Sequence, residues 1–144
     1  MLKAIPSMEV TDAYQSDAVQ MGGPLESLHI DDVEAVAADS AYLSRRNCDI
    51  VEALGAKPFI KLKCNVKGKS HGSFAWRRMV HDFRRNPEEW KRVYHFRSSA
   101  ESAFSALKRK FGYRLSAIRK DPQRKELMVK VIVYNLNILA RLTI

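Results

Sequence analysis

The chain has 144 residues, a length that predicts one domain with a sizeable hydrophobic core. Its net charge of +9 is uneven, because residues 1–43 hold one Lys and eight acids, whereas residues 44–144 hold 24 Lys and Arg and eight acids. A cationic segment of this kind favours a polyanionic partner, above all nucleic acid, with a solubilising surface as the alternative. The two cysteines form no CxxC pair, which argues against structural zinc.

The first sixty residues predict strands that alternate with helices. Residues 2–10 are typical of a short strand that leads into a polar turn at residues 11–12, and a helix is expected between residues 16 and 28, broken near the Gly22-Gly23-Pro24 run. Residues 34–38 predict a buried strand, and residues 58–62 predict another. Between them Ser44 is placed to cap a helix that ends at Gly55. This alternation indicates an α/β sheet covered by helices on both faces.

The rest of the chain predicts a loop and three helices. Residues 63–72 are basic and poor in apolar side chains, which indicates an exposed, mobile loop. The next helix has an apolar face at Trp76, Met79, Val80 and Phe83 and an arginine-rich face opposite. Asn86-Pro87 restarts a helix that runs to about Lys110 before Gly112, and Asp121-Pro122 begins the last one. The apolar stretch 127–144 is interrupted by polar residues, so it predicts a buried helix and not a membrane span.

One helical face carries an unusual set of polar side chains. Tyr94, Arg97, Glu101 and Lys108 have the spacing Y-x2-R-x3-E-x6-K, and on one continuous helix they fall within about 60° of one another. A carboxylate between cations suits the handling of a metal ion and phosphates. The alternative is that Glu101 is an ordinary surface residue that forms an ion pair with Arg97. Such a pair stabilises a helix by only a few tenths of a kcal/mol.

This spacing resembles the Y-R-E-K signature of insertion-sequence DDE transposases. The segment Val36-Ala37-Ala38-Asp39-Ser40-Ala41-Tyr42 is similar to the family's second acidic segment, and the resemblance covers roughly residues 5–142. It implies an α/β fold that is RNase H-like (retroviral-integrase-like), with a mixed sheet flanked by helices. The chain is then one partial catalytic domain, residues 1–144, with a basic loop and helix insertion at about residues 63–86.

The resemblance also implies roles for individual residues. Asp39 and Glu101 are then catalytic metal ligands for Mg²⁺ or Mn²⁺, hard ions that prefer carboxylate oxygens, in a site that holds two metal ions when complete. Arg97 and Lys108 are expected to hold DNA phosphates, and Tyr94 to lie near the scissile phosphate unless it is a core tyrosine. Further sequence-independent contacts to DNA are expected from Lys61, Lys63, Lys67, Lys69, Arg77, Arg78, Arg84 and Arg85.

The family's first Asp has no counterpart in the sequence, so we expect an N-terminally truncated domain that is weak or inactive alone. Two functions stay open: a DDE transposase that performs metal-dependent DNA cleavage and strand transfer when complete, or a non-catalytic DNA-binding or inhibitory remnant. Expected partners are transposon and target DNA, a second copy of the chain or the full-length transposase. The expected location is the prokaryotic cytoplasm, in association with the nucleoid, and no membrane partner is expected.

Overall fold

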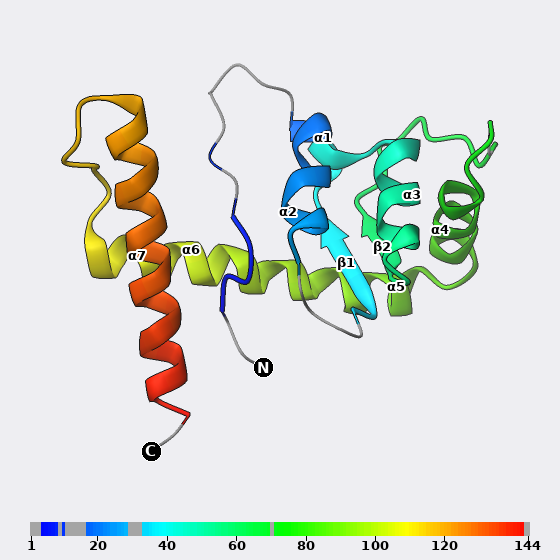
Figure 1. Ribbon diagram of the computed structural model, residues 1–144. Helices are drawn as coiled ribbons and strands as arrows, with labels where there is room; N and C mark the ends of the chain where they lie inside the picture. Colours follow the sequence, from blue (N-terminus) through cyan, green and yellow to red (C-terminus); the bar gives the residue numbers. More distant parts are fainter. Residues whose placement is uncertain (1–3, 9, 11–16, 29–32, 70, 143–144) are drawn as a thin grey trace. The chain divides into compact units, whose positions relative to one another are not determined.

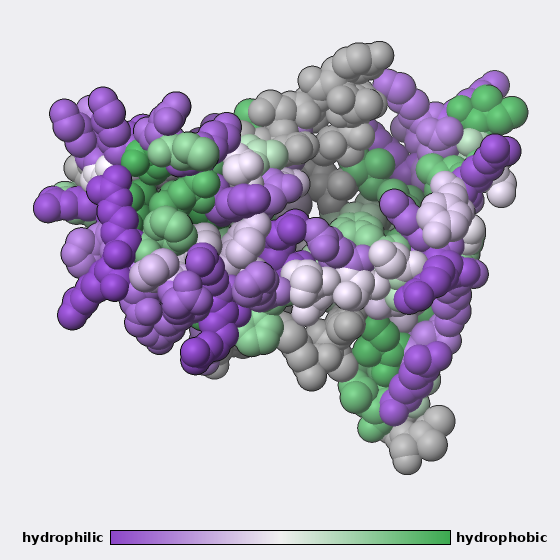
Figure 2. Space-filling model, turned by 180° about the vertical axis from the view of Figure 1, so that it is seen from behind, coloured by the Kyte–Doolittle hydropathy of each residue, from purple (hydrophilic) through white to green (hydrophobic). Residues whose placement is uncertain are grey.

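The computed structural model describes residues 4–8, 10, 17–28, 33–69 and 71–142. The chain divides into two compact units, Thr11–Arg97 and Met1–Val10 with Ser98–Ile144 (Figure 1). Hydrophilic side chains cover much of the face drawn in Figure 2, as the high charge requires. The assignment of the whole chain to a single domain stays a prediction.

The unit Thr11–Arg97 is a mixed α/β structure. Its elements are α1 (Asp17–Gln20), α2 (Gly22–Glu26), β1 (Ala35–Ala38), η1 (Ser40–Tyr42), α3 (Arg45–Ala53), β2 (Lys57–Ile60), α4 (Phe74–Arg85), α5 (Pro87–Tyr94) and η2 (His95–Arg97). The two strands are parallel, with Ala35 beside Lys57 and Ala38 beside Ile60, and α3 connects them. The described residues thus contain a two-stranded parallel sheet, where a mixed sheet was expected.

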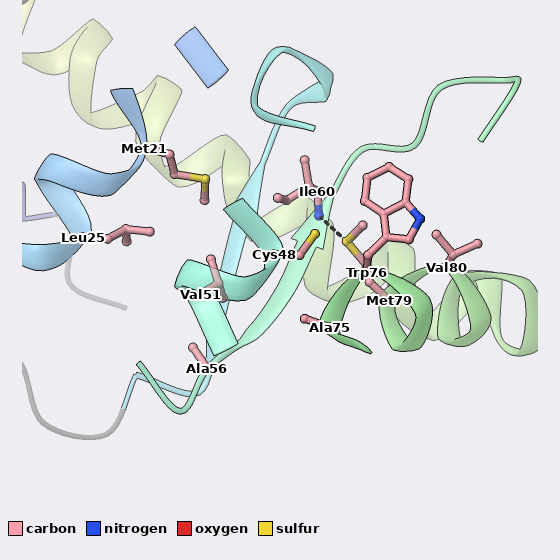
Figure 3. Packing of buried hydrophobic residues seen from close by; sticks show 10 residues of the cluster. All are labelled: Met21, Leu25, Cys48, Val51, Ala56, Ile60, Ala75, Trp76, Met79 and Val80. Carbon is pink, nitrogen blue, oxygen red and sulfur yellow. Dashed lines mark hydrogen bonds between the residues drawn. The ribbon is translucent and has the colours of Figure 1, made fainter. Parts of the chain in front are cut away.

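Helices cover both faces of this sheet, as predicted. Ile60 is fully buried in a cluster with side chains of α3 and α4, and its backbone N–H lies 3.5 Å from the sulfur of Met79 (Figure 3). The preceding residue, Phe59, packs against Trp90 of α5 with ring centroids 5.7 Å apart. Because successive strand residues point to opposite faces, α5 covers the face of β2 opposite to that of Ile60.

Local capping signals in the sequence set the helix boundaries. The side-chain oxygens of Ser44, Ser73 and Asn86 accept hydrogen bonds from backbone N–H groups in the first turns of α3, α4 and α5. The positive φ of Gly55, 77°, ends α3, as predicted. The helix expected between residues 16 and 28 is interrupted at Met21, with Gly22-Gly23-Pro24 inside α2. Pro24 is tolerated there because the first turn of a helix has no partners for its N–H groups.

The other unit pairs α6 (Ser98–Phe111) with α7 (Lys120–Ala140). Ala103 and Leu107 of α6 are buried against Val131 and Tyr134 of α7. The prediction of a strand over residues 2–10 is wrong for residues 4–8 and 10, which belong to no strand. The physical reason is a contact with a residue far along the chain: the side-chain amide of Asn135 donates to the Ile5 carbonyl at 2.7 Å and accepts from the Ile5 N–H at 2.9 Å, in the place of a neighbouring strand.

The helix α7 begins and ends close to the predicted positions, but the expectation that it is buried is wrong along one side. Met128, Ile132, Leu136 and Leu139 are each about half exposed. In the part of the chain that the structure describes, no helix combines the length and the apolar character that a membrane span requires.

Residues 112–119, which connect α6 to α7, form a loop held by side chains of α7. The Glu126 carboxylate accepts hydrogen bonds from the N–H groups of Ser116 and Ala117 at 2.8–3.0 Å, and it pairs with Lys130 at 2.9 Å. The Lys130 ammonium also donates to the Arg114 carbonyl at 3.1 Å. The hydrogen bond from Lys130, and then those from Ala117 and Ser116, lower the pKa of Glu126 to about 2.

This pKa shift makes the stability of the loop depend on pH. A carboxyl group with a lowered pKa in the folded chain stabilises it fully above its ordinary pKa of 4.5, and this contribution is lost as the pH falls toward about 2. We expect the difference in urea-unfolding free energy between the parent chain and Glu126→Gln to be constant near neutral pH and to shrink below about pH 4.5. A difference that stays constant down to pH 2.5 would contradict this role of Glu126.

Candidate functional site

Asp39 lies at the carboxyl end of β1, where the sequence predicts it. Its Oδ1 accepts a hydrogen bond from the Ala41 N–H at 2.8 Å and so caps η1, and its side chain is half-buried. Lys61 follows β2 at the same edge of the sheet, since its N–H donates to the Ala38 carbonyl at 3.1 Å. Asp39 therefore has the capping role that is the structural alternative to metal binding, while Oδ2 has no hydrogen-bond partner among the described residues.

The four signature residues are divided between the two units. Tyr94 ends α5, Arg97 lies in η2, and Glu101 and Lys108 are exposed on α6. The expected continuous helix over residues 86–110 is wrong at residues 95–97, where a 3₁₀ turn interrupts it. Glu101 and Lys108 share a face of α6, because seven residues are nearly two full turns. The common face of all four residues, and the pairing of Asp39 with Glu101, stay predictions.

An aromatic cluster around Trp90 positions Tyr94 and Arg97. The rings of Trp90 and Tyr94 are stacked with centroids 5.3 Å apart and planes inclined by 15°, and the Arg97 guanidinium lies 5.6 Å from the centroid of the Tyr94 ring. Phe83 meets Trp90 edge-on at 5.1 Å. Aromatic contacts of this kind contribute about 0.5–1.5 kcal/mol each and the cation–π contact about 0.5–1 kcal/mol. Trp90 itself is buried.

The basic loop before α4 and one face of α4 form a cationic hollow of about 730 Å³. It is lined by Lys67, Gly68, Lys69, His71, Arg77 and Arg84. Three donors from outside the loop hold its backbone: Arg84 donates to the Val66 carbonyl at 3.1 Å, the Trp76 indole N–H to the Lys67 carbonyl at 3.1 Å, and Arg45 to the Lys69 carbonyl at 3.3 Å. The loop is thus tied to α3 and α4, and its exposed lysines surround the hollow.

The four arginines of α4 do not share one environment. Arg77 and Arg84 lie on one face, seven residues apart, and line the cationic hollow. Arg78 is ion-paired with Glu52 of α3. Arg85 lines a different hollow of about 960 Å³, whose other charged residues are Glu34, Lys57, Asp82 and Glu89. Only Arg77 and Arg84 therefore stand in a uniformly basic setting.

Two residues escaped the sequence analysis: one holds the loop beside the cationic hollow, and the other lines the hollow. Arg45 stacks on the Trp76 ring, 4.7 Å from its centroid, and so links the start of α3 to α4 and to the loop. His71 has a φ of 43°, a left-handed conformation rare outside glycine, and it lines the hollow. The basic, apolar-poor composition of residues 63–72 predicted a loop, but it gave no sign of either contact.

The described residues contain no group of three or more His, Cys, Asp or Glu side chains close enough to hold a metal ion. Several acids that precede Asp39, including Asp12, Asp31 and Asp32, lie outside the residues that the structure describes. Cys48 is unsuited to nucleophilic or metal chemistry, because burial, with a smaller effect of Asp49, raises the pKa of its thiol to about 12. The carboxylates of Asp39 and Glu101 are the donor chemistry that Mg²⁺ or Mn²⁺ prefers.

Comparison with known proteins decides the family. A family model described as "Transposase DDE domain" matches residues 3–136, nearly the whole chain. The chain belongs to the DDE transposases. Neither curated proteins nor solved structures gave a match. Family membership confirms the resemblance to DDE transposases and indicates DNA transposition, an RNase H-like fold and the use of divalent metals by the family.

Ser73 offers a test of how the basic loop is anchored in this transposase domain. Its buried hydroxyl accepts from the Trp76 N–H at 3.1 Å and donates to Asp49 at 2.6 Å, so it joins the end of the loop to α4 and α3. Ser73→Ala is expected to lower the free energy of unfolding by about 1–2 kcal/mol, measured in urea. Ser102→Ala, which removes an exposed hydroxyl bonded to its own helix, should change it by less than about 0.5 kcal/mol. Equal effects would contradict the anchoring role.

Proposed function

We propose that this chain is the catalytic domain of an insertion-sequence transposase of the Y-R-E-K subgroup, which holds transposon DNA beside a carboxylate-bound divalent metal. The observation that carries the proposal is the family match over residues 3–136, and the resemblance of the segments around Asp39 and Glu101 to the family's acidic segments supports it. Membership of the DDE transposases indicates that the family acts in transposition. The roles of individual residues in binding DNA and metal are what we propose.

The DNA backbone is proposed to lie along the cationic hollow beside α4. Lys67, Lys69, Arg77 and Arg84 surround it without an acidic side chain among the lining residues. The hydrogen bonds to the loop carbonyls support this proposal, because a loop that is already held in place loses little conformational freedom when it binds DNA. Such contacts bind phosphates regardless of base sequence and position the duplex. Weaker contacts with DNA phosphates are proposed for Lys61, Lys63, Arg78 and Arg85.

Arg97 is proposed to hold a phosphate close to the reacting bond. Its guanidinium is planar, and its stacking on Tyr94 restricts it before DNA arrives. Tyr94 is itself fixed by Trp90, which supports a positioning role for its ring. On α6, Lys108 is proposed to supply a second point charge for the same DNA strand, on the face that also carries Glu101.

Asp39 and Glu101 are proposed to bind Mg²⁺ or Mn²⁺. The free oxygen of Asp39 lies beside the cap to Ala41, so metal binding does not require the loss of that cap. When bound, the metal supplies charge neutralisation at the phosphate and activation of a water or 3′-hydroxyl. The protein's part is then to orient the phosphate through Arg97 and Lys108.

A second candidate is a DNA-holding protein of the same family without the chemistry. It is favoured by the lack of a three-acid group among the residues that the structure describes. In this case the cationic hollow keeps its function, while the acids contribute only to the fold.

The test is nicking of supercoiled plasmid by the purified chain with Mn²⁺ or Mg²⁺, beside DNA binding measured over a range of salt. We expect salt-dependent binding, and slow nicking that disappears in Asp39→Asn and Glu101→Gln. Glu88→Gln is the matched control, because Glu88 is an exposed helix acid that pairs with Lys91 across one turn. The double variant Lys69→Ala, Arg77→Ala should weaken DNA binding. It should also reduce the slope of log Kd against log salt by nearly two, because two phosphate contacts are lost.

The outcomes separate the two candidates. Binding without nicking in every variant favours the DNA-holding protein. Nicking that survives Glu101→Gln would contradict the assignment of the acids, and failure to bind DNA at low salt would contradict both candidates.

A further inference from the structure

The loop between α6 and α7 combines a fixed backbone with side chains left in water. Tyr113 is 80% exposed and Ile118 is 94% exposed. Scattered exposed apolar residues are ordinary on protein surfaces, so exposure alone signals nothing. Here, however, the neighbouring backbone is held at three positions, by Glu126, Lys130 and the Gln123 side chain, which donates to the Ala117 carbonyl at 2.9 Å.

The position of Ile118 follows directly from these bonds. The preceding residue, Ala117, has its N–H bonded to Glu126 and its carbonyl bonded to Gln123. The loop thus presents Ile118 to solvent from a backbone that α7 already fixes. A preformed loop of this kind avoids much of the ordering cost that a mobile loop meets on binding.

The surroundings of the loop are strongly cationic. Residues 108–125 include eight Lys and Arg against one Asp, and all nine of these side chains are exposed. Arg114 and Arg119 lie in the loop itself. At the upper right of Figure 2, where this end of α6 and α7 lies, green atoms stand among purple ones. An apolar tip between arginines fits a polyanion with an apolar interior, because apolar side chains that enter the minor groove partly unstack base pairs while cations hold the phosphates.

We propose that the loop at residues 112–119 is a second DNA-contacting element, in which Ile118 enters the minor groove of duplex DNA while Arg114 and Arg119 bind the flanking phosphates. Tyr113 lies against the sugar–phosphate backbone beside the insertion. The inference rests on the proposed function only in that it requires the chain to meet DNA, and it concerns residues outside the signature and outside the cationic hollow.

The test is binding of the full chain to a duplex of about 20 base pairs that carries 2-aminopurine, a base whose fluorescence rises when it is unstacked. The parent chain should raise the fluorescence. Ile118→Ser should abolish the rise and weaken binding about three- to tenfold. Ile132→Ser is the matched control, since Ile132 is a half-exposed isoleucine on α7, and it should leave both readouts unchanged. Unchanged thermal melting verifies the fold of each variant.

Glu126→Gln separates loop geometry from charge. The substitution raises the net charge of the chain by one, so simple electrostatic attraction would tighten binding to DNA. The proposal expects the opposite, a smaller fluorescence rise and weaker binding, because the backbone of Ser116 and Ala117 loses its anchor. Arg114→Gln with Arg119→Gln should lower the slope of log Kd against log salt by about two.

Each contrary outcome has a distinct meaning. DNA binding without a fluorescence rise, or equal behaviour of Ile118→Ser and Ile132→Ser, overturns the loop proposal and leaves the proposed function intact. Lack of DNA binding by the parent chain overturns both. Binding to vesicles of anionic phospholipid that depends on Ile118, with DNA binding unaffected, would assign the loop to a membrane surface and overturn its assignment to DNA.

Discussion

The packing of Trp90 is the contact on which the unit Thr11–Arg97 depends. Its ring contacts Phe59 of β2, Phe83 of α4 and Tyr94 of α5. One side chain therefore joins α4 and α5 to the face of β2 opposite to that of Ile60. Its indole N–H is buried and has no hydrogen-bond partner among the described residues, which costs about 1–3 kcal/mol. The same Trp90 ring fixes Tyr94, and Tyr94 in turn contacts Arg97, so the unpaired N–H belongs to the cluster that positions these two residues.

Backbone carbonyls and aromatic rings hold several of the arginines in the part of the chain that the structure describes. Arg45 and Arg84 bond to loop carbonyls, and Arg97 stacks on Tyr94. A carbonyl oxygen or an aromatic ring carries no full negative charge, so such a contact orients a guanidinium without neutralising it. Arg78 is the contrasting case, since its ion pair with Glu52 offsets its charge. This arrangement agrees with a family that acts on DNA.

Features that depend on a few neighbouring residues could be predicted from the sequence. The caps at Ser44 and Asn86, the end of α3 at Gly55 and the strand before Asp39 all follow from local chemistry. Features that depend on distant contacts could not. The segment around Ile5 is held by Asn135, 130 residues away, so its apolar pattern alone suggested a strand. The 3₁₀ turn at residues 95–97 escaped prediction because the apolar and polar periodicity continues through it. For the site, the sequence resemblance assigns Asp39 and Glu101 as the family's acids, and this assignment stays a prediction; their separation along the chain gives no information on the distance between them.

The central proposal is that Asp39 and Glu101, although they lie in different units, are ligands of one divalent metal site. The most direct measurement is the broadening of backbone amide NMR signals by substoichiometric Mn²⁺, an effect that falls steeply with distance from the ion and is therefore strongest at the ligands. The account predicts that signals next to Asp39 and next to Glu101 broaden together, and that Glu101→Gln relieves the broadening at both places. Broadening at one acid alone, or at neither, would contradict it.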